Sequence, residues 1–436
     1  MRCFLLVLCW VIGTNALVAQ PATTKYDWPQ FLGPNGDSQS PETGILTQWP
    51  ANGLKILWEA EMGQGFAPPV IQAGKLYHFD RFRDTNRLTC RDAITGKSLW
   101  KYEYETDYID SYGYSPGPRA CPVVDGERVY CYGPEGMLVC LKSTDGTVVW
   151  SNDTRKNYHF QQNFFGVGSV PLVYQDLLIV AIGGSPKGER VFDLRDAKGN
   201  GTAIVAFDKK TGKEIYRFGN ELASYASPTI RKIADKDVGL YFARGGLVLF
   251  DPKTGKELTS FPWRAEILES VNASNPTVVG SQILLTECYG PGGVLLDYQQ
   301  NKLKVLWSDV EKDRDEKSLR CHWNTPVHRD GYVYGSSGRH ENEATLRCVR
   351  WKDGEVMWEK KGLSRTSLLW IDGHFLCLSE RSELILFKEN HQKYQEIAVW
   401  KTDLDYPAWA APIVCNGILY LRGADRLIAC EIMKKR

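Results

Sequence analysis

A nine-residue motif that returns along the chain constrains its fold more than any other feature. The motif is DAITGKSLW at residues 92–100, and related copies are KSTDGTVVW at 142–150, DKKTGKEIY at 208–216 and DPKTGKELT at 251–259. A unit that recurs at a spacing of roughly 40–50 residues is typical of solenoids and propellers, in which each repeat buries its apolar face against the next. We therefore expect the 436 residues to form one repeat array rather than two or three separate domains.

A second recurring unit precedes the turn motif. It consists of a proline, two or three apolar residues, a short polar turn and an apolar–aromatic pair, as in PVVDGERVY at 122–130. Eight copies begin at Pro69, Pro122, Pro171, Pro228, Pro276, Pro326, Ser367 and Pro412. Asp-Gly and Asn-Gly turns between apolar residues favour β-hairpins, and the two units together hold four short strands. We predict an all-β, eight-bladed β-propeller of four-stranded antiparallel blades.

The two ends of the chain complement each other. The last unit holds strands at 412–420 and 425–430 and stops before a fourth strand, whereas residues 54–58 (LKILW) form a strand with no blade before it. Pairing of this N-terminal strand with the C-terminal blade would close the ring and remove an exposed edge. We expect the propeller to span residues 55–433 and an extended lead-in to span 20–54.

Several conspicuous residues fall at fixed places in the repeat, so we expect them to pack rather than to bind. A large ring at the end of the fourth strand can fill the gap between neighbouring blades. This place is held by Trp100, Trp150, Trp307, Trp358 and Trp400. The middle of the third strand suits a small buried apolar residue, and it is held by Cys90, Cys140 and Cys348. Ten cysteines follow the N-terminal leader, and their pairing is left open.

The N-terminus has the features of an export signal. Arg2 precedes the apolar run 3–12, and small residues follow, which predicts a cleaved signal peptide at 1–19. The run is too short to cross the ~30 Å hydrocarbon core of a membrane. Leu8 stands before Cys9, where a lipid-attachment signal has a small residue, so we expect a periplasmic or secreted protein without a lipid anchor.

The charge balance argues against two classes of partner. The chain has 53 basic and 52 acidic residues and a net charge of +1. A neutral chain has no general attraction for nucleic acid or for an anionic membrane. We expect a monomer that binds no nucleic acid and has no transmembrane segment.

The turn motif resembles the repeat of pyrroloquinoline-quinone-type (PQQ-like) propellers, whose hallmark is Ala-Leu-Asp-x-x-Thr-Gly-x-x-x-Trp. That repeat is shared by quinoprotein alcohol dehydrogenases and by the BamB outer-membrane assembly lipoprotein, and the resemblance covers about residues 55–433. The segment WPQFLGPNG at 28–36 is also similar to the lead-in of exported bacterial members. The resemblance implies a non-catalytic protein- or ligand-binding scaffold of the bacterial cell envelope. The alternative that it implies is a dehydrogenase that oxidises alcohols or sugars with PQQ and calcium.

The residues favour the scaffold over the dehydrogenase. Dehydrogenases of this family carry two adjacent cysteines above the cofactor, and no two cysteines are adjacent in this chain. Glu269 and Asn272 stand near the start of a first strand, where calcium ligands lie in the family, but no neighbouring aspartate is marked out as a base. We expect no enzymatic activity and no cofactor, and assign PQQ and calcium to the alternative only.

The long loops of the predicted propeller gather on one face. In a four-stranded blade, the 2–3 loops and the links to the next blade leave on one face, and the 1–2 and 3–4 turns leave on the other. Nearly all long segments belong to the first group, namely 103–118, 157–165, 183–201 and 308–323. The 1–2 turns are short, with the exception of 231–237. Because function concentrates on loops held by a rigid scaffold, we expect the elaborated face to bind an envelope protein or a glycan.

The residues just before each first strand are expected at the mouth of the central channel on this face. The candidate ligand-binding residues there are Arg119, Tyr225, Asn275, His322, Trp323, Asn324, Arg365 and Trp409. Arginine, amide and indole side chains suit an anionic or sugar-like ligand. The linear order shows no nucleophile–base constellation, so no catalytic or metal-binding residue is assigned, and the identity of the ligand or partner is left open.

Overall fold

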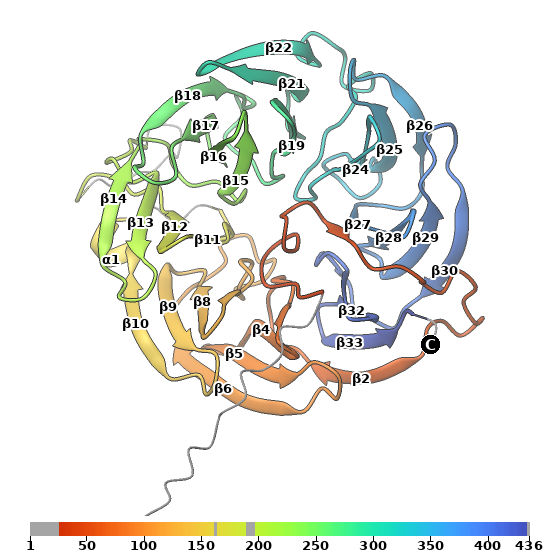
Figure 1. Ribbon diagram of the computed structural model, residues 1–436, viewed down its shortest axis with the longest axis horizontal. Coiled ribbons are helices and arrows are strands. Elements are labelled where there is room, and N and C mark those ends of the chain that lie inside the picture. The colour runs from red at the N-terminus through yellow and green to blue at the C-terminus, as the bar shows by residue number, and fades with distance from the viewer. Residues whose placement is uncertain (1–25, 161–163, 189–196, 434–436) are drawn as a thin grey trace, which may run out of the picture.

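The chain forms eight sheets around a central axis (Figure 1). The structure is a computed structural model that describes residues 26–160, 164–188 and 197–433. Seven sheets have four strands, and the remaining one has five because β1 (Gln39–Ser40) joins it. Consecutive strands within a blade are antiparallel. The predicted eight-bladed β-propeller of four-stranded antiparallel blades is therefore confirmed. The expected signal peptide at 1–19 lies outside the described residues.

Each blade runs from a strand beside the channel to a strand at the rim, and the blades are numbered 1–8 in this order. The innermost strands are β3 Val70–Gln72, β7 Val123–Asp125, β11 Leu172–Tyr174, β15 Thr229–Ile233, β19 Thr277–Val279, β23 Val327–Arg329, β27 Thr366–Ile371 and β31 Ile413–Cys415. The second strands are β4 Lys75–Phe82, β8 Arg128–Tyr132, β12 Leu177–Ala181, β16 Lys236–Phe242, β20 Gln282–Glu287, β24 Tyr332–Ser337, β28 His374–Ser379 and β32 Ile418–Arg422.

The outer half of each blade continues the same antiparallel order. The third strands are β5 Thr85–Asp92, β9 Met137–Lys142, β13 Ile204–Asp208, β17 Gly246–Phe250, β21 Gly292–Gln299, β25 Thr345–Arg350, β29 Glu383–Lys388 and β33 Arg426–Glu431. The rim strands are β6 Ser98–Glu105, β10 Val148–Asp153, β14 Glu214–Phe218, β18 Glu257–Pro262, β22 Lys302–Ser308, β26 Val356–Lys360, β30 Glu396–Lys401 and β2 Ile56–Glu61. The second and third strands are almost wholly buried, whereas the rim strands alternate between exposed and partly buried residues.

The 1–2 hairpins close with two-residue turns, as expected. At Asp330 and Gly331, for example, φ is 46° and 83°. These positive values match the twist of antiparallel strands and suit glycine, asparagine and aspartate. The longer excursion expected at 231–237 is wrong. Strands β15 and β16 extend through it and pair up to Ile233 and Lys236, so only a two-residue turn remains.

The recurring Thr-Gly motif is a joint between blades. In blade 1, Asp92 Oδ1 accepts hydrogen bonds from the amide and the hydroxyl of Thr95, both at 2.8 Å. Gly96 has a φ of +72°, and a Cβ added there would lie 2.6 Å from the ring of Trp58 in the neighbouring blade. The indole nitrogen of Trp58 donates to the carbonyl of Ala93 at 3.0 Å. The same ring-on-glycine contact recurs at Trp100–Gly146, Trp150–Gly212, Tyr216–Gly255 and Trp307–Gly354.

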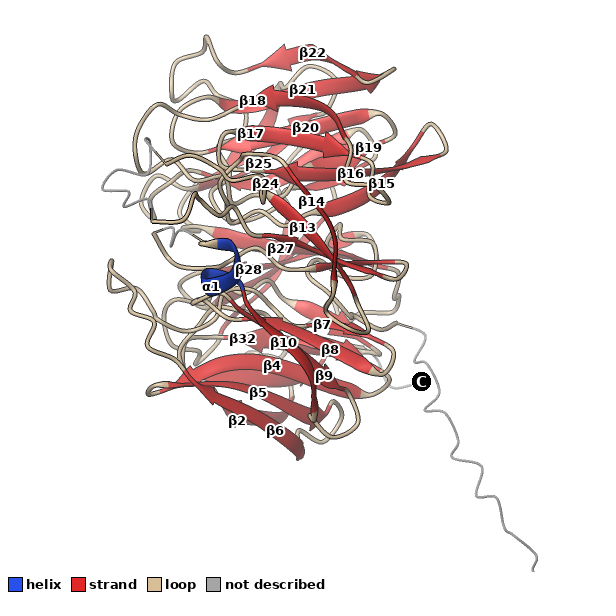
Figure 2. Ribbon diagram, turned by 90° about the vertical axis from the view of Figure 1, so that its left-hand side faces the viewer, coloured by secondary structure: helices blue, strands red, loops and turns tan. Residues whose placement is uncertain are grey.

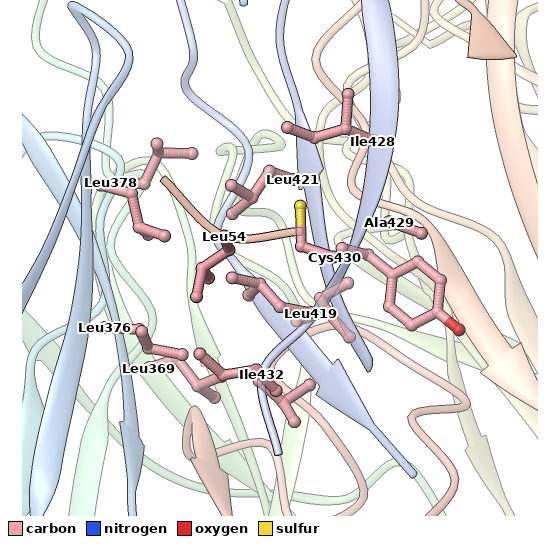
Figure 3. Close-up of a cluster of buried hydrophobic side chains, with 14 of the residues drawn as sticks. Leu54, Leu369, Leu376, Leu378, Leu419, Leu421, Ile428, Ala429, Cys430 and Ile432 are labelled. Atoms are coloured by element: carbon pink, nitrogen blue, oxygen red, sulfur yellow. The ribbon is translucent and has the colours of Figure 1, made fainter. Parts of the chain in front are cut away.

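The N-terminal strand closes the ring. Strand β2 pairs antiparallel with β33, with Trp58 opposite Ala429, and completes the last blade. Leu54, just before β2, lies among buried side chains of the last two blades, including Leu419 and Leu376 (Figure 3). The turn before β2 also supplies Gly53, on which the ring of Trp400 packs.

The lead-in crosses the channel on the face that carries the 1–2 turns. The amide and carbonyl of Trp28 each bond to Ile71 at 2.8 Å, and β1 pairs in parallel with β27. Arg231 holds the middle of the lead-in by donating to the carbonyl of Gly36 at 2.7 Å. In Figure 1 this segment, drawn in red, runs from the centre out over blade 7.

The two faces of the disc differ. On the loop face, which carries 106–122, 154–160, 164–171 and 309–326, the connections are long and include the short helix α1 (Thr154–Tyr158) (Figure 2). The opposite face, here the turn face, carries mostly tight turns. All ten cysteines of the described residues are buried and unpaired. Among the described residues, no helix has the length and apolar character needed to cross a membrane.

Candidate functional site: a cup at the mouth of the channel

A cavity of about 310 Å³ opens from the loop face at the centre of the ring. All eight blades contribute to its lining, mostly through the links that precede their first strands. The aromatic part of this lining consists of Phe66, Tyr112, Tyr114, Phe164, Phe165, Tyr225, Tyr289, Trp323 and Trp409. We call this cavity the cup.

The lead-in forms the floor of the cup. Phe31, Leu32 and Ser38 line the cavity, and Leu32 is buried. Leu32 and Ser38 both have positive φ, at 60° and 55°, because the chain must turn sharply to cross the narrow channel. The propeller channel is thereby made into a site that opens toward the loop face.

The rings of the cup contact one another rather than standing apart. The centroids of Trp323 and Trp409 are 4.9 Å apart, and Phe66 lies 4.5 Å from Trp409. Tyr114 lies 6.1 Å from Trp409 and meets Phe165 edge-on at 5.6 Å. Such tilted and edge-on pairs are the favoured arrangements of aromatic side chains. They give the cup a wall that is already packed before a ligand enters.

Arg365 is held in this wall by a buried carboxylate. Its guanidinium makes a bidentate contact with Glu380, with a shortest distance of 2.6 Å, and the side chain of Glu380 is fully buried. The same carboxylate accepts from the indole of Trp409 at 2.9 Å. The guanidinium also lies 4.4 Å over the ring of Trp323. The positive charge of Arg365 is therefore neutralised within the protein, and its contacts fix both tryptophans.

Arg119 is neutralised in the same way elsewhere in the wall. It donates to Asp110 Oδ2 at 3.3 Å, and the side chain of Asp110 is only 2% exposed. Its guanidinium lies between the rings of Phe66 and Phe165, at 5.3 and 5.1 Å. Cation–π contacts of this kind favour a fixed position for both groups. Arg119 thus supports the aromatic wall, and its charge is not free to bind an anionic ligand.

His322 lies in the wall as a neutral imidazole. Its Nε2 contacts the Tyr289 hydroxyl at 2.9 Å, and its Nδ1 faces the guanidinium of Arg365 at 3.5 Å. Because a guanidinium can only donate, Nδ1 is the accepting nitrogen and Nε2 carries the proton. Burial, followed by the charge of Arg365, lowers the pKa of His322 to about 3. It therefore has no charge to offer a ligand near neutral pH.

Two charged side chains of the cup have no counter-ion among the described residues. Arg339, just after β24, stacks over the ring of Tyr289 at 4.5 Å, and no acceptor lies within hydrogen-bond distance of its guanidinium in the described part of the chain. Glu269, in the link between blades 4 and 5, is exposed and likewise has no cation beside it there. Among the described residues, the cup therefore offers one cation and one carboxylate without a counter-ion, Arg339 and Glu269.

The structure brings together seven of the eight residues expected at the channel mouth. Arg119, Tyr225, His322, Trp323, Asn324, Arg365 and Trp409 all line the cup. Asn275 does not line the cup. It is buried, its Oδ1 accepts from the backbone amide of Ser227 at 2.8 Å, and its backbone amide donates to the hydroxyl of Thr325 at 3.1 Å. Asn275 therefore ties neighbouring blades together beside the cup.

The sequence did not single out the floor of the cup or Arg339 as binding residues, and it named Glu269 only as a calcium ligand of the dehydrogenase alternative. Phe31 and Leu32 lie in the lead-in, which contains no copy of the repeat, so the repeat pattern could not predict its position. Tyr289 and Arg339 each follow a second strand by two residues, so the rule that 2–3 loops leave on the loop face was a signal that could have found them. Of the expected loops, 103–118 and the described part of 157–165 supply much of the aromatic wall. The described residues of 183–201 do not line the cup.

The described side chains do not form the calcium site of the alternative. Asn272 is buried, and its amide nitrogen donates to the carbonyls of Ala243 and Trp263 at 2.8 and 3.2 Å, so this residue supports the backbone of the link. Glu269 stands alone, and no group of three or more His, Cys, Asp or Glu side chains with metal-binding geometry occurs among the residues described. A calcium ion needs six to eight oxygen ligands. The donor set expected for that cofactor is not assembled here.

The fold and the repeat together define a propeller of the PQQ-like type, and comparison with known proteins places it in a family. The family model described as "Outer membrane protein assembly factor BamB" matches residues 111–360. The chain belongs to this family.

Relatives and solved structures show the same architecture at low identity. Quinohemoprotein alcohol dehydrogenase ADH IIB from Pseudomonas putida is 26% identical over 191 residues, which are 41% of this chain and 24% of the relative. The chain thus matches about a quarter of that enzyme's length. The crystal structure of BamB from Moraxella catarrhalis superposes with a TM-score of 0.60 at 15% identity, covering 88% of this chain and 99% of that one. A quinohemoprotein alcohol dehydrogenase from Comamonas testosteroni gives 0.50 at 14% identity, with 94% and 81% covered. These structural likenesses show the fold.

Proposed function

We propose that the protein is a non-catalytic binding propeller of the bacterial cell envelope, which holds a ligand or a segment of a partner in the cup. The observation that carries this proposal is the construction of the cup. All eight blades and the lead-in combine to build an aromatic cavity with a closed floor, and Arg119 and Arg365 are engaged in holding its walls. Concave apolar sites with a few fixed polar groups are typical of binding sites.

The wall chemistry supports binding over catalysis. His322, which could act as a base, is engaged by Tyr289 and Arg365, and no serine or cysteine is hydrogen-bonded to it among the described residues. A covalent mechanism needs a nucleophile within reach of its base. Membership of the assembly-factor family and the apolar leader at the N-terminus support a place in the envelope, where a protein or glycan would meet the loop face.

The rim tyrosines provide the test. Tyr112 and Tyr114 are 52% and 61% exposed at the cup, so they can be changed without opening the core. The protein is used to capture partners from an envelope fraction, and the affinity of each identified partner is then measured with the purified Tyr112→Ser/Tyr114→Ser variant. We expect binding to weaken about tenfold or more, because exposed aromatic anchors carry much of an interface's energy. Ile94→Ser, at a 67% exposed site on a 3–4 turn, is the matched control.

Two results would count against the proposal. If the control variant weakens binding as much as the tyrosine variant, the cup is not the binding site. The dehydrogenase alternative is favoured by the match to the Pseudomonas putida enzyme. It is tested by adding PQQ and Ca²⁺ to the purified protein and following dye-linked oxidation of alcohols. Turnover that depends on both additions would replace the scaffold with an enzyme.

A further inference from the structure

The free charges of the cup specify a class of ligand more narrowly than its shape does. The positive charges of Arg119 and Arg365 are neutralised by ion pairs with Asp110 and Glu380 inside the walls. In the described part of the chain, the charged side chains of the cup that are left without a counter-ion are Arg339 and Glu269, one positive and one negative. A simple anion would be attracted by one and repelled by the other, and the same holds for a simple cation.

We propose that the cup binds a small zwitterion with an aromatic or large apolar body, such as a free aromatic α-amino acid. Arg339 would hold the carboxylate and Glu269 the ammonium group, while the body lies against the rings. This inference rests on the proposed function, because it names the ligand of the same cup.

Arg339 is positioned to bind a carboxylate. Its guanidinium lies over the Tyr289 ring at 4.5 Å, and Tyr289 is itself fixed by His322. Stacking on a ring occupies the face of a guanidinium and leaves its edge free, and this edge has the fork geometry that matches a carboxylate. The backbone is held as well, because the Arg339 amide donates to Glu343 Oε1 at 2.7 Å and its carbonyl accepts from Arg365 at 3.1 Å. The cation is therefore held in place before a ligand arrives.

Glu269 supplies the complementary charge. Its side chain is exposed, and the residues that follow it, Ser270 and Val271, are buried, so the carboxylate stands on an anchored stretch of the link. Ser270 is fixed by hydrogen bonds from its hydroxyl to Glu287 at 3.1 Å and from the amide of Ala265 at 3.2 Å. An ammonium ion binds a carboxylate through charge-assisted hydrogen bonds.

The remaining surface suits an apolar body of limited size. The aromatic wall stands above a floor that includes Phe31 and Leu32, and the volume of about 310 Å³ is at the low end of small-molecule sites. This favours a ligand of amino-acid size over a polymer. Tyr112 and Phe165, 5.5 Å apart in an edge-on pair, give the body a ring surface to contact.

The test compares four probes by isothermal titration calorimetry with the full-length protein. L-phenylalanine has both charges and the body; phenylalaninamide lacks the carboxylate, N-acetylphenylalanine lacks the ammonium group, and glycine lacks the body. We expect phenylalanine to bind, and each of the other probes to bind about tenfold more weakly or worse, because each leaves a charged group or the ring wall without its partner.

Two variants assign the charges. Arg339→Gln should weaken phenylalanine about tenfold but should not weaken phenylalaninamide, which has no carboxylate to lose and is no longer repelled by the guanidinium. Glu269→Gln should weaken phenylalanine but should not weaken N-acetylphenylalanine, which has no ammonium group to lose and is no longer repelled by the carboxylate. Arg155→Gln, at a cation whose side chain is 60% exposed on the loop face outside the cup, is the matched control. Thermal unfolding of each variant confirms that it is folded.

Each other outcome overturns the inference. If N-acetylphenylalanine binds as tightly as the free amino acid, the cup recognises a carboxylate terminus and not a zwitterion. If phenylalaninamide binds equally well, Arg339 holds no carboxylate. If no probe binds, the ligand class is wrong, while the scaffold stands as long as the Tyr112/Tyr114 variant loses its partner. Binding of phenylalanine without any effect of that variant on partner capture would instead refute the scaffold.

Discussion

The ring-on-glycine contact between blades leads to a prediction about ring closure that the structure makes quantitative. In the Gly96→Ala variant, the new Cβ would sit 2.6 Å from the ring of Trp58, at a residue whose φ is +72°. The left-handed backbone alone costs about 1 kcal/mol for alanine. Trp58 must also move, which loses its hydrogen bond to Ala93, worth about 1 kcal/mol, and part of its ring packing, worth about 1 kcal/mol more. We expect the free energy of unfolding to fall by about 3 kcal/mol.

Gly74→Ala separates the two causes. Gly74 has almost the same φ, +74°, but no atom lies within 4 Å of an added Cβ, so only the backbone cost of about 1 kcal/mol applies. Urea unfolding followed by intrinsic fluorescence gives both values, provided that the dependence on urea is unchanged. In a Trp58→Leu background, Gly96→Ala should cost no more than Gly74→Ala. Equal losses for the two glycine variants in the wild-type background would refute the idea that this contact closes the ring.

Three further outcomes follow from buried charge and from the lead-in. Arg365→Gln leaves the fully buried Glu380 without its cation and should cost about 3–5 kcal/mol in urea unfolding, and Arg365→Gln/Glu380→Gln should recover part of it. Burial lowers the pKa of His78 to about 3 from its usual 6.5, so between these values the unfolded chain binds the extra proton. The free energy of unfolding should therefore fall as the pH drops from 6.5 toward 3, and His78→Gln should flatten that slope. Arg231→Ala removes the hydrogen bond to the Gly36 carbonyl, so limited proteolysis should cut the lead-in faster than in the wild type.

The blades could be predicted because their signals are local and repeated. A turn motif such as that ending at Gly96 and Trp100 carries its cap, its left-handed residue and its packing ring within nine residues, and each copy supports the others. The missing strand of the last blade could be found for the same reason, since Trp58 matches the place of Trp100. The β2–β33 pairing confirms that step.

The charge state of the cup could not be predicted in this way. Arg365 and Glu380 are separated by 15 residues and meet because β27 and β28 form a hairpin. Arg119 finds Asp110 within one irregular link. The path of such links decides which arginine is paired with a carboxylate and which is not. That path follows no periodic pattern in the sequence. The sequence therefore placed Arg119 and Arg365 correctly at the mouth but gave them the role of anion binding, for which Arg339 has the better geometry.

The same residue type has two roles in this fold, and position relative to the repeat separates them. Trp150 ends a rim strand and packs on Gly212 of the next blade. Trp323 and Trp409 fall outside that register, in links before first strands, and line the cup. A ring at the end of a rim strand packs on the turn glycine of the neighbouring blade. A ring in a link between blades makes its contacts with residues outside the repeat. In this propeller those contacts are with each other and with Arg365, at the one place where all blades converge.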